Sequence, residues 1–225
     1  MGDMKNLNAK AFISMLVIFS VLIWVLILYV TGTELKVSWE ALKHLPTVVS
    51  IDTVLWLLFI KWGWKYNLFH KWLVPFPCLE GTWEGKLQTT WINPETGNTS
   101  RLIPVILVIK QSFISISCVM YSQEMTSQSY AAEFLFDREN NLKKITYTYR
   151  SIPRATVRNR SVIHDGTVLL EVIATPFRVL RGEYWTNRKS TGEVDLKFKS
   201  KELMQSFPDN LIPQAEEQSN PSERV

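Results

Sequence analysis

Two long apolar runs occupy the first third of the chain, and the remainder alternates between apolar and polar positions. Residues 11–31 (AFISMLVIFSVLIWVLILYVT) are 21 consecutive residues without a charge. At about 1.5 Å per residue, a helix of this length crosses the roughly 30 Å hydrocarbon core of a bilayer. A signal peptide is the alternative, but its apolar region spans only about 7–15 residues and precedes a small-residue cleavage site. The pattern therefore predicts a transmembrane helix over 11–31.

A second apolar run covers residues 46–64 (PTVVSIDTVLWLLFIKWGW). Pro46 suits the first turn of a helix, where its missing N–H is not needed. Asp52 is the sole acidic residue in either run. A carboxylate inside a membrane is a candidate for function, so Asp52 is predicted to take part in membrane coupling. The alternative is an interfacial Asp that stabilises a helix N-terminus.

Residues 1–72 are therefore expected to form a hairpin of two transmembrane helices, 11–31 and 46–64. Five lysines flank the two runs on the same side: Lys5, Lys10, Lys61, Lys65 and Lys71. The loop 32–45 between the runs carries two lysines against two glutamates. Basic flanks favour the cytoplasmic side of a membrane. The sequence thus predicts a multi-pass protein whose N-terminus and whose chain beyond residue 72 are cytoplasmic.

The chain from residue 73 onward has the signals of β structure. Residues 73–80 contain Pro75 and Pro77 and predict an extended linker. Eight strand-like segments follow, at 81–93, 101–111, 114–125, 130–137, 142–150, 166–175, 179–187 and 193–199. Eight short strands joined mostly by tight turns predict a mainly β domain over 81–200, a closed up-and-down antiparallel barrel, with a two-sheet sandwich as the alternative. Residues 201–225 are polar and are predicted to be a mostly disordered tail.

Alternation also predicts which side chains point into the barrel, because successive residues of a strand face opposite sides. In the first strand Trp83, Leu87 and Trp91 share one face, and Glu84 and Lys86 share the other. The other positions expected inside are Gly85, Thr89, Ala132, Phe134, Phe136, Ile145, Tyr147, Tyr149, Leu180, Gly182, Tyr184, Thr186, Val194, Leu196 and Phe198. The second and third strands are ambiguous, because both faces of 101–110 are apolar.

An up-and-down topology places the ends of alternate strands at the barrel end away from the membrane. The predicted ligand-binding residues at this end are Trp91, Tyr149, Arg150, Arg154, Arg158, Arg160, Tyr184, Thr186, Asn187 and Arg188. Arginine offers a planar fork to phosphate, and aromatic rings offer faces on which bases stack. The pattern indicates a small nucleotide with phosphates on the arginines, bases on the aromatic rings, and hydrogen bonds from Thr186 and Asn187. The alternative is that the arginines solvate a turn and the tyrosines pack the core.

Charge and missing motifs narrow the function. Residues 79–200 hold 16 Lys and Arg against 12 Asp and Glu, and four of the arginines fall between 150 and 160. The excess of positive charge is thus concentrated at one rim of the predicted barrel. The sequence has no phosphate-loop or dinucleotide-binding glycine motif, no metal-ligand spacing of histidines, and no recognisable catalytic arrangement. It therefore predicts no enzyme, no metal and no cofactor, and its two cysteines, Cys78 and Cys118, are read as inert thiols of a reducing compartment.

Two motifs resemble known barrels. The segment 81–85 (GTWEG) is similar to the G-x-W opening of lipocalin-type barrels, in which the tryptophan plugs one end, so Trp83 is the expected plug. The segment 180–187 (LRGEYWTN) resembles a late strand of such a barrel. Two N-terminal transmembrane helices followed by these motifs, over about residues 10–200, resemble the two-transmembrane, β-strand-rich effectors of CBASS antiphage defence.

The resemblance implies a function. Such effectors have a minimal eight-stranded barrel that binds a cyclic dinucleotide, made by a partner nucleotidyltransferase during phage infection. Binding promotes homo-oligomerisation, and the transmembrane helices then disrupt the bacterial inner membrane, so that the infected cell dies. The partners implied are thus the cyclic dinucleotide, the lipid bilayer and further copies of the chain, with no DNA or RNA polymer. The alternative is a membrane-anchored, lipocalin-like carrier or sensor of a small apolar ligand.

Overall fold

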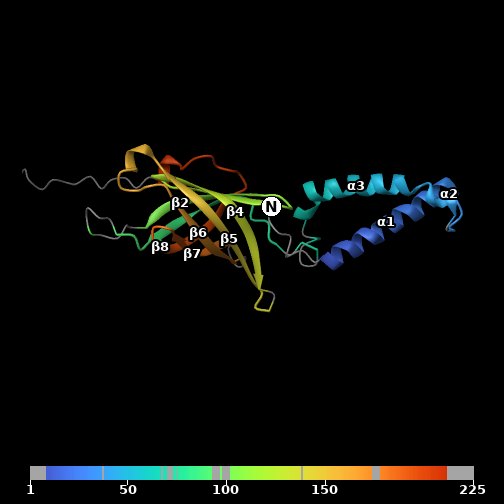
Figure 1. Ribbon diagram of the computed structural model, residues 1–225, viewed down its shortest axis with the longest axis horizontal. Helices are drawn as coiled ribbons and strands as arrows, with labels where there is room; N and C mark the ends of the chain where they lie inside the picture. The colour runs from blue at the N-terminus through green and yellow to red at the C-terminus, as the bar shows by residue number, and fades with distance from the viewer. Residues whose placement is uncertain are drawn as a thin grey trace, which may run out of the picture.

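The chain forms a closed β-barrel with a helical hairpin that projects from one of its ends (Figure 1). The computed structural model describes residues 9–36, 38–66, 68–69, 73–74, 76–92, 97, 102–137, 139–173 and 178–211. The predicted fold class is confirmed, since a closed antiparallel barrel of eight strands follows two apolar helices. The barrel end next to the hairpin is called the hairpin end below, and the opposite end is called the mouth.

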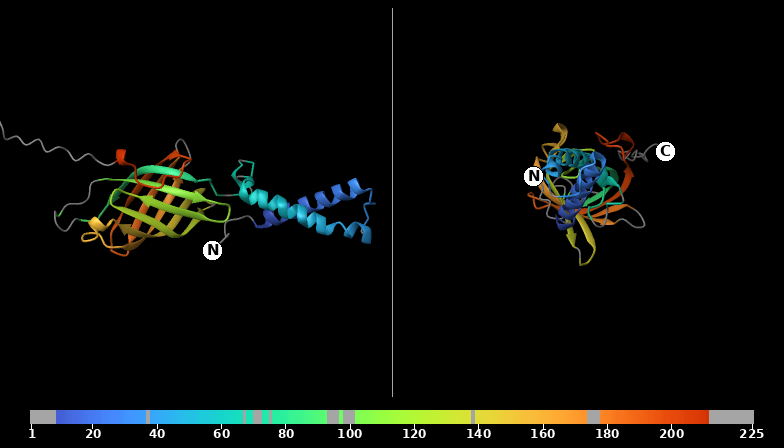
Figure 2. Two further views of the ribbon diagram at one scale, coloured as in Figure 1. Left: turned by 90° about the horizontal axis from the view of Figure 1, so that it is seen from above. Right: turned by 90° about the vertical axis from the view of Figure 1, so that its right-hand side faces the viewer.

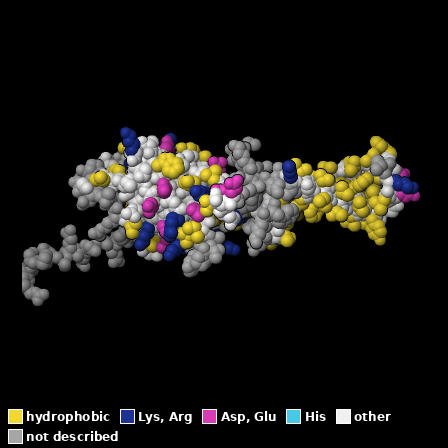
Figure 3. All heavy atoms as spheres, turned by 90° about the horizontal axis from the view of Figure 1, so that it is seen from below, with side chains coloured by type: hydrophobic (Ala, Val, Ile, Leu, Met, Phe, Trp, Pro, Cys, Tyr) yellow, Lys and Arg dark blue, Asp and Glu magenta, His cyan; other side chains and the backbone are white. Residues whose placement is uncertain are grey.

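The hairpin consists of α1 (Ala9–Thr31), the short α2 (Trp39–Leu42), α3 (Leu45–Lys61) and the 3-10 turn η1 (Gly63–Lys65). Pro46 lies in the first turn of α3, as predicted. The first apolar span covers 20 residues and the second, counted from α2 to the end of α3, covers 23. Both are long and apolar enough to cross a membrane, and apolar side chains cover the outside of the hairpin (Figure 3).

Two polar contacts hold the hairpin together. The Ser20 hydroxyl donates a hydrogen bond to the Asp52 carboxylate at 2.7 Å, and the Trp24 indole N–H donates to the Ala41 carbonyl at 3.0 Å. Asp52 lies seven residues after Leu45, the first residue of α3, which places it beyond the first turn of that helix. The carboxylate is therefore engaged by the facing helix α1, in line with the packing of α1 along α3 (Figure 2), rather than by the helix N-terminus.

The barrel follows the up-and-down order. Its strands are β1 (Gly81–Thr89), β2 (Ile103–Gln111), β3 (Ile116–Tyr121), β4 (Met125–Asp137), β5 (Leu142–Pro153), β6 (His164–Ile173), β7 (Val179–Thr186) and β8 (Thr191–Ser200). Each strand pairs antiparallel with the next, and β1 pairs with β8 to close the ring. The two-sheet sandwich is thereby excluded. The predicted strands begin or end up to five residues away from the observed ones, most visibly at the start of β4.

One apolar cluster occupies the barrel interior, and it contains most of the apolar side chains that alternation placed inside. Phe136 packs instead against a separate aromatic cluster, and Trp91 lines a cavity at the mouth. The ambiguous strand β2 points Val105, Leu107 and Ile109 into this cluster. Its outward residues Ile106 and Val108 are also buried, because they lie against a separate cluster formed by the chain after β8. Strand β2 is therefore apolar on both faces because both faces are covered.

The chain after β8 differs from the disordered tail expected from residue 201 onward. Phe207 is buried on the outer face of β2, and the partly buried Met204 and Leu211 pack against the same cluster. The Met204 N–H also donates to the Thr82 hydroxyl at 3.2 Å. Residues 201–211 are therefore a packed part of the barrel domain, while the rest of the expected tail, 212–225, lies outside the described residues.

Large side chains fill the hairpin end of the barrel. Trp83, the expected plug, is 1% exposed there, and its indole N–H donates to the Leu79 carbonyl at 2.9 Å. The Arg178 guanidinium lies over the Phe198 ring at 3.8 Å and near the Trp83 ring at 5.5 Å. These contacts leave the interior at this end packed.

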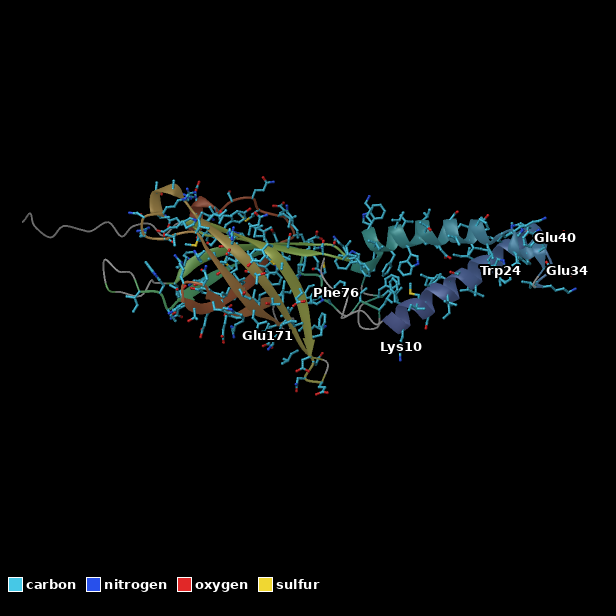
Figure 4. The ribbon with its side chains drawn as sticks, viewed as in Figure 1. Lys10, Trp24, Glu34, Glu40, Phe76 and Glu171 are labelled. Carbon is cyan, nitrogen blue, oxygen red and sulfur yellow. The ribbon has the colours of Figure 1, made fainter. Side chains whose placement is uncertain are left out.

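An aromatic cluster joins this end to the hairpin. Its buried members include Phe59 and Trp64 from the hairpin, Phe76 from the linker and Phe113 from the β2–β3 turn. Phe76 lies where the hairpin meets the barrel (Figure 4), with its ring stacked on that of Phe134 at 5.6 Å. Phe76 and its described neighbours in the predicted linker are therefore packed between the two parts.

Candidate functional site

A cavity of about 410 Å³ opens at the mouth of the barrel. The ends of β1, β5 and β7, the starts of β2, β6 and β8, and the β3–β4 turn all contribute to its wall. Its size falls in the range of roughly 300–1,000 Å³ that is typical of small-molecule sites. The mouth faces away from the hairpin, as the strand order predicted.

The lower wall of the cavity is apolar. It is formed by side chains that also belong to the barrel core, namely Leu87, Val105, Met120, Val168 and Val194. Tyr147 lies among them and is 2% exposed. Its hydroxyl has no hydrogen-bond partner among the described residues.

The upper wall carries buried hydroxyl groups. Some bond to one another: the Ser127 hydroxyl donates to that of Ser151 at 3.0 Å, and the Thr186 and Ser190 hydroxyls lie 2.7 Å apart. The members of this hydroxyl ring are Thr89, Ser127, Ser151, Ser161, Thr186 and Ser190. A hydroxyl group both donates and accepts hydrogen bonds, so this wall suits a ligand with several polar atoms.

Arg188 brings positive charge into the same wall. It donates to the Ser161 hydroxyl at 3.2 Å and contacts Nε2 of His164 at 3.4 Å. Its Nε is buried and has no partner in the described part of the chain. Burial lowers the pKa of this guanidinium, although arginine keeps its proton at any physiological pH. The cavity therefore holds a charge that is only partly solvated.

His164 supports Arg188 as an acceptor. Its Nδ1 lies 3.0 Å from the Val162 carbonyl, which can only accept, so the ring proton is on Nδ1 and Nε2 is free to accept from Arg188. Burial is the main cause that lowers the pKa of the imidazole below 6.5. His164 is therefore neutral near pH 7, and the positive charge at this point belongs to Arg188.

Two tyrosines lie against glycines in the neighbouring strands. Tyr149 pairs with Gly166, where a Cβ atom would lie 2.5 Å from the tyrosine hydroxyl oxygen. Tyr184 pairs with Gly192, where a Cβ atom would lie 2.5 Å from the tyrosine ring. The missing side chains make room for the rings flat against the wall. Burial raises the pKa of both hydroxyls, so they remain neutral.

The cavity brings together six of the ten predicted ligand-binding residues: Trp91, Tyr149, Arg160, Tyr184, Thr186 and Arg188. Of these, Arg160 is ion-paired with Glu124 from the β3–β4 turn, so its charge is compensated. This difference distinguishes Arg160 from Arg188, for which no carboxylate partner is found within the described residues.

The other four predicted residues lie outside the cavity wall. Arg150 points from the outer face of β5 and makes two hydrogen bonds, at 2.9 and 3.0 Å, to the carboxylate of Asp165. Arg154 and Asn187 are exposed, and Arg158 donates to the Pro153 carbonyl at 3.2 Å. Two of the four arginines between 150 and 160 thus have partners outside the cavity, and a third is exposed.

Sequence reasoning missed most of the hydroxyl ring and His164. Ser127, Ser151 and His164 lie on stretches of β4, β5 and β6 that were expected to be loops, because they carry no apolar alternation. The spacing of these residues along each strand could have identified them. Ser151 and His164 lie an even number of residues from an inward-facing residue of the same strand. Ser127 does so as well once the extra residue of the bulge at Ser129/Ala131 in β4 is left out of the count.

No cluster of three or more His, Cys, Asp or Glu side chains that could hold a metal ion occurs in the described ranges. Cys118, in the barrel core, is fully buried, and burial raises the pKa of its thiol. A thiol in this state is a poor nucleophile.

Comparison with known proteins agrees with this geometry. Residues 74–198, more than half of the chain, match the family model described as "Cap15, cyclic dinucleotide receptor domain". The chain belongs to this family. The matched residues begin in the packed linker and end in β8, so they cover the barrel and its cavity.

Two curated relatives extend the comparison. A CD-NTase-associated protein 15 of Staphylococcus schleiferi is 28% identical over 181 residues, which are 80% of this chain and 91% of the relative. A protein of the same name from Escherichia albertii is 26% identical over 152 residues, 65% of this chain and 73% of the relative. The family resemblance inferred from the motifs is thereby confirmed, and this is a family of receptors rather than of known enzymes.

Proposed function

We propose that the mouth cavity binds a cyclic dinucleotide made by a partner nucleotidyltransferase. The observation that carries the proposal is Arg188, a partly buried guanidinium. Within the described residues its Nε has no partner and it faces no carboxylate. Removing such a charge from water costs free energy that a bound anion recovers. A phosphodiester supplies that anion in the geometry that a guanidinium recognises.

The surrounding groups match the other parts of such a ligand. Trp91, Tyr149 and Tyr184 line the upper cavity and offer ring faces to bases. The hydroxyl ring provides donors and acceptors for sugar and phosphate oxygens. An apolar ligand would leave the Arg188 charge without a counter-charge and its Nε without a partner, which argues against a carrier of apolar molecules.

Calorimetric titration of the full chain in detergent with cyclic dinucleotides tests the proposal. Arg188→Ala is expected to weaken binding by roughly 10- to 150-fold, because a hydrogen bond to a charged group contributes about 1.5–3 kcal/mol. Arg154→Ala is the matched control, since it removes an exposed arginine of the same rim and is expected to bind like the parent. Equal affinity of Arg188→Ala and the parent would refute the site. Preferential binding of an apolar fluorescent probe would favour the carrier instead.

We further propose that the hairpin lies in the bacterial inner membrane with the barrel in the cytoplasm. The apolar surface of the hairpin supports this, because side chains such as Leu22, Leu26 and Leu57 are about 60% exposed and would otherwise face water. The charges agree: Lys10 lies at the end near the barrel (Figure 4), where α3 and η1 also end with Lys61 and Lys65, whereas at the opposite tip Glu34 and Glu40 offset two lysines. A basic flank on the barrel side favours a cytoplasmic barrel.

In this proposal, ligand binding promotes assembly of several copies, and the assembled hairpins disrupt the bilayer and kill the infected cell. The aromatic cluster supports a mechanical link, since Phe134 of β4 stacks on Phe76 and Phe59 of α3 packs edge-on against Phe113. In this proposal a movement of β4 at the mouth is transmitted to α3 through these packed rings.

Dye release from vesicles that contain the full chain tests this second step. Cyclic dinucleotide is expected to trigger release and to increase the particle size of the protein in detergent. Arg188→Ala vesicles are the control and are expected to stay intact at the same ligand concentration. If the chain bound the ligand without dye release or assembly, the receptor function would stand and the membrane-disrupting role would be refuted.

A further inference from the structure

Tyr147 is an unusual residue for its position. It lies on β5 two residues before Tyr149, which places it about 7 Å deeper in the barrel at roughly 3.4 Å per residue. At this depth its register partner in β6 is Val168. The ring is 2% exposed and packs in the apolar core, yet the hydroxyl has no partner within the described residues.

A buried hydroxyl without a partner destabilises a fold, because the group has lost its hydrogen bonds to water. Phenylalanine would fill the same space without this cost. Tyr147 contributes to the cavity wall, so a ligand that fills the cavity contacts this residue. A hydroxyl that is costly for folding and belongs to a residue of a binding cavity is expected where it contacts a ligand.

The chemistry of the surroundings selects which part of a ligand reaches this depth. Arg188 and the hydroxyl ring are at the mouth, whereas the wall around Tyr147 consists of Leu87, Val105 and other apolar side chains. A phosphate would have no counter-charge there. Both riboses of a cyclic dinucleotide are held in the phosphodiester ring, so the bases are the parts that project farthest from the phosphates. A base is also flat and uncharged, with hydrogen-bonding atoms only at its edge.

We propose that one base of the ligand enters the barrel and that the Tyr147 hydroxyl bonds its edge, which makes Tyr147 a residue that determines base preference. This inference rests on the proposed function of the cavity. The second base remains at the mouth, against the aromatic rings of Trp91, Tyr149 or Tyr184. The barrel therefore reads the two bases of one ligand in different ways, one by an edge contact and one by stacking.

Full-length Tyr147→Phe, which removes a single oxygen atom, is the direct test. Calorimetric titration is performed with cyclic dinucleotides that share one linkage and differ only in their bases. For the preferred ligand, Tyr147→Phe is expected to reduce affinity about 3- to 10-fold, the loss of one net hydrogen bond, and to narrow the spread of affinities across the panel. Tyr130→Phe is the matched control, because Tyr130 is 66% exposed on the outside of the barrel.

Thermal unfolding without ligand separates recognition from structure. If the hydroxyl serves the ligand, Tyr147→Phe unfolds at the same temperature as the parent or higher, because an unpaired buried group is gone. A lower unfolding temperature with an unchanged base preference would overturn the inference, as would an unchanged affinity profile. In either case the loss of affinity in Arg188→Ala would still support the receptor. If the parent bound no member of the panel, the proposed function would fail together with the inference.

Discussion

The two ends of the barrel are built from the same strands and the same alternation, yet their interiors differ. At the hairpin end Trp83 and Phe198 fill the space, and the Trp83 indole is satisfied by the Leu79 carbonyl. The exposed Arg178 lies over both rings. At the mouth the space is open and two polar atoms, in Tyr147 and Arg188, lack partners among the described residues. One end is packed for stability, and the other keeps unsatisfied groups that the proposed ligand would complete.

The largest effect on stability is expected from removing a large side chain at the packed hairpin end. Trp83→Ala removes a fully buried indole and is expected to lower the free energy of unfolding by about 3–5 kcal/mol. Far-UV circular dichroism of the barrel during thermal unfolding in detergent measures this loss. If the hairpin end were as tolerant as the mouth, the change would cost little, and the distinction between the two ends would fail.

A smaller effect is expected from filling the mouth. Gly166→Ala places a methyl group 2.5 Å from the Tyr149 hydroxyl oxygen and 2.8 Å from the Trp185 carbonyl. The Tyr149 ring is then forced into the cavity, at a cost of about 1–3 kcal/mol. Both the unfolding temperature and the affinity for the ligand are expected to fall. Unchanged affinity would show that the position of Tyr149 does not matter for binding.

The mouth is also expected to respond to pH through His164. Its pKa in the folded protein lies below the ordinary 6.5, so the unfolded chain binds more protons as pH falls. The stability that this group contributes is complete above pH 6.5 and is lost as pH falls below that value. Affinity for an anionic ligand changes in the opposite direction, because a protonated imidazole adds positive charge beside Arg188.

Ligand titrations and unfolding curves at pH 7.5 and 5.5 separate the effect of pH on affinity from its effect on stability. His164→Gln is the control and is expected to flatten the His164 contribution to both profiles. A ligand affinity that fell on acidification would contradict the placement of the phosphate at Arg188 and His164.

The smallest effect concerns the hairpin. Asp52→Asn keeps the size of the side chain and weakens its bond with Ser20, for which about 0.6 kcal/mol is an average value between membrane helices. If Asp52 couples the hairpin to assembly, ligand-dependent dye release and toxicity change while ligand affinity does not. Unchanged killing at normal expression would leave Asp52 as a structural contact, and Ser20→Ala should then behave in the same way.

Periodicity and strand order in the sequence were enough to predict the fold class and the position of the mouth relative to the hairpin. A charge-free run of 21 residues, strict alternation in β5 and β7, and strand order were enough to predict a hairpin, a closed barrel and a mouth away from the hairpin. These features depend on local periodicity and on hydrophobic burial, and both can be read directly from the order of residues.

Tertiary structure alone decided which polar residues belong to the mouth. Four arginines in one rim look equivalent in the sequence, but Arg150 is held by Asp165 and Arg160 by Glu124, and both acids come from distant segments. Ser127, Ser151 and His164 resembled loop residues because strand extension there depends on pairing with neighbours. The apolar outer face of β2 was likewise explained only by Phe207, about a hundred residues later. Each of these depends on contacts between residues far apart in the chain, which neither periodicity nor composition records.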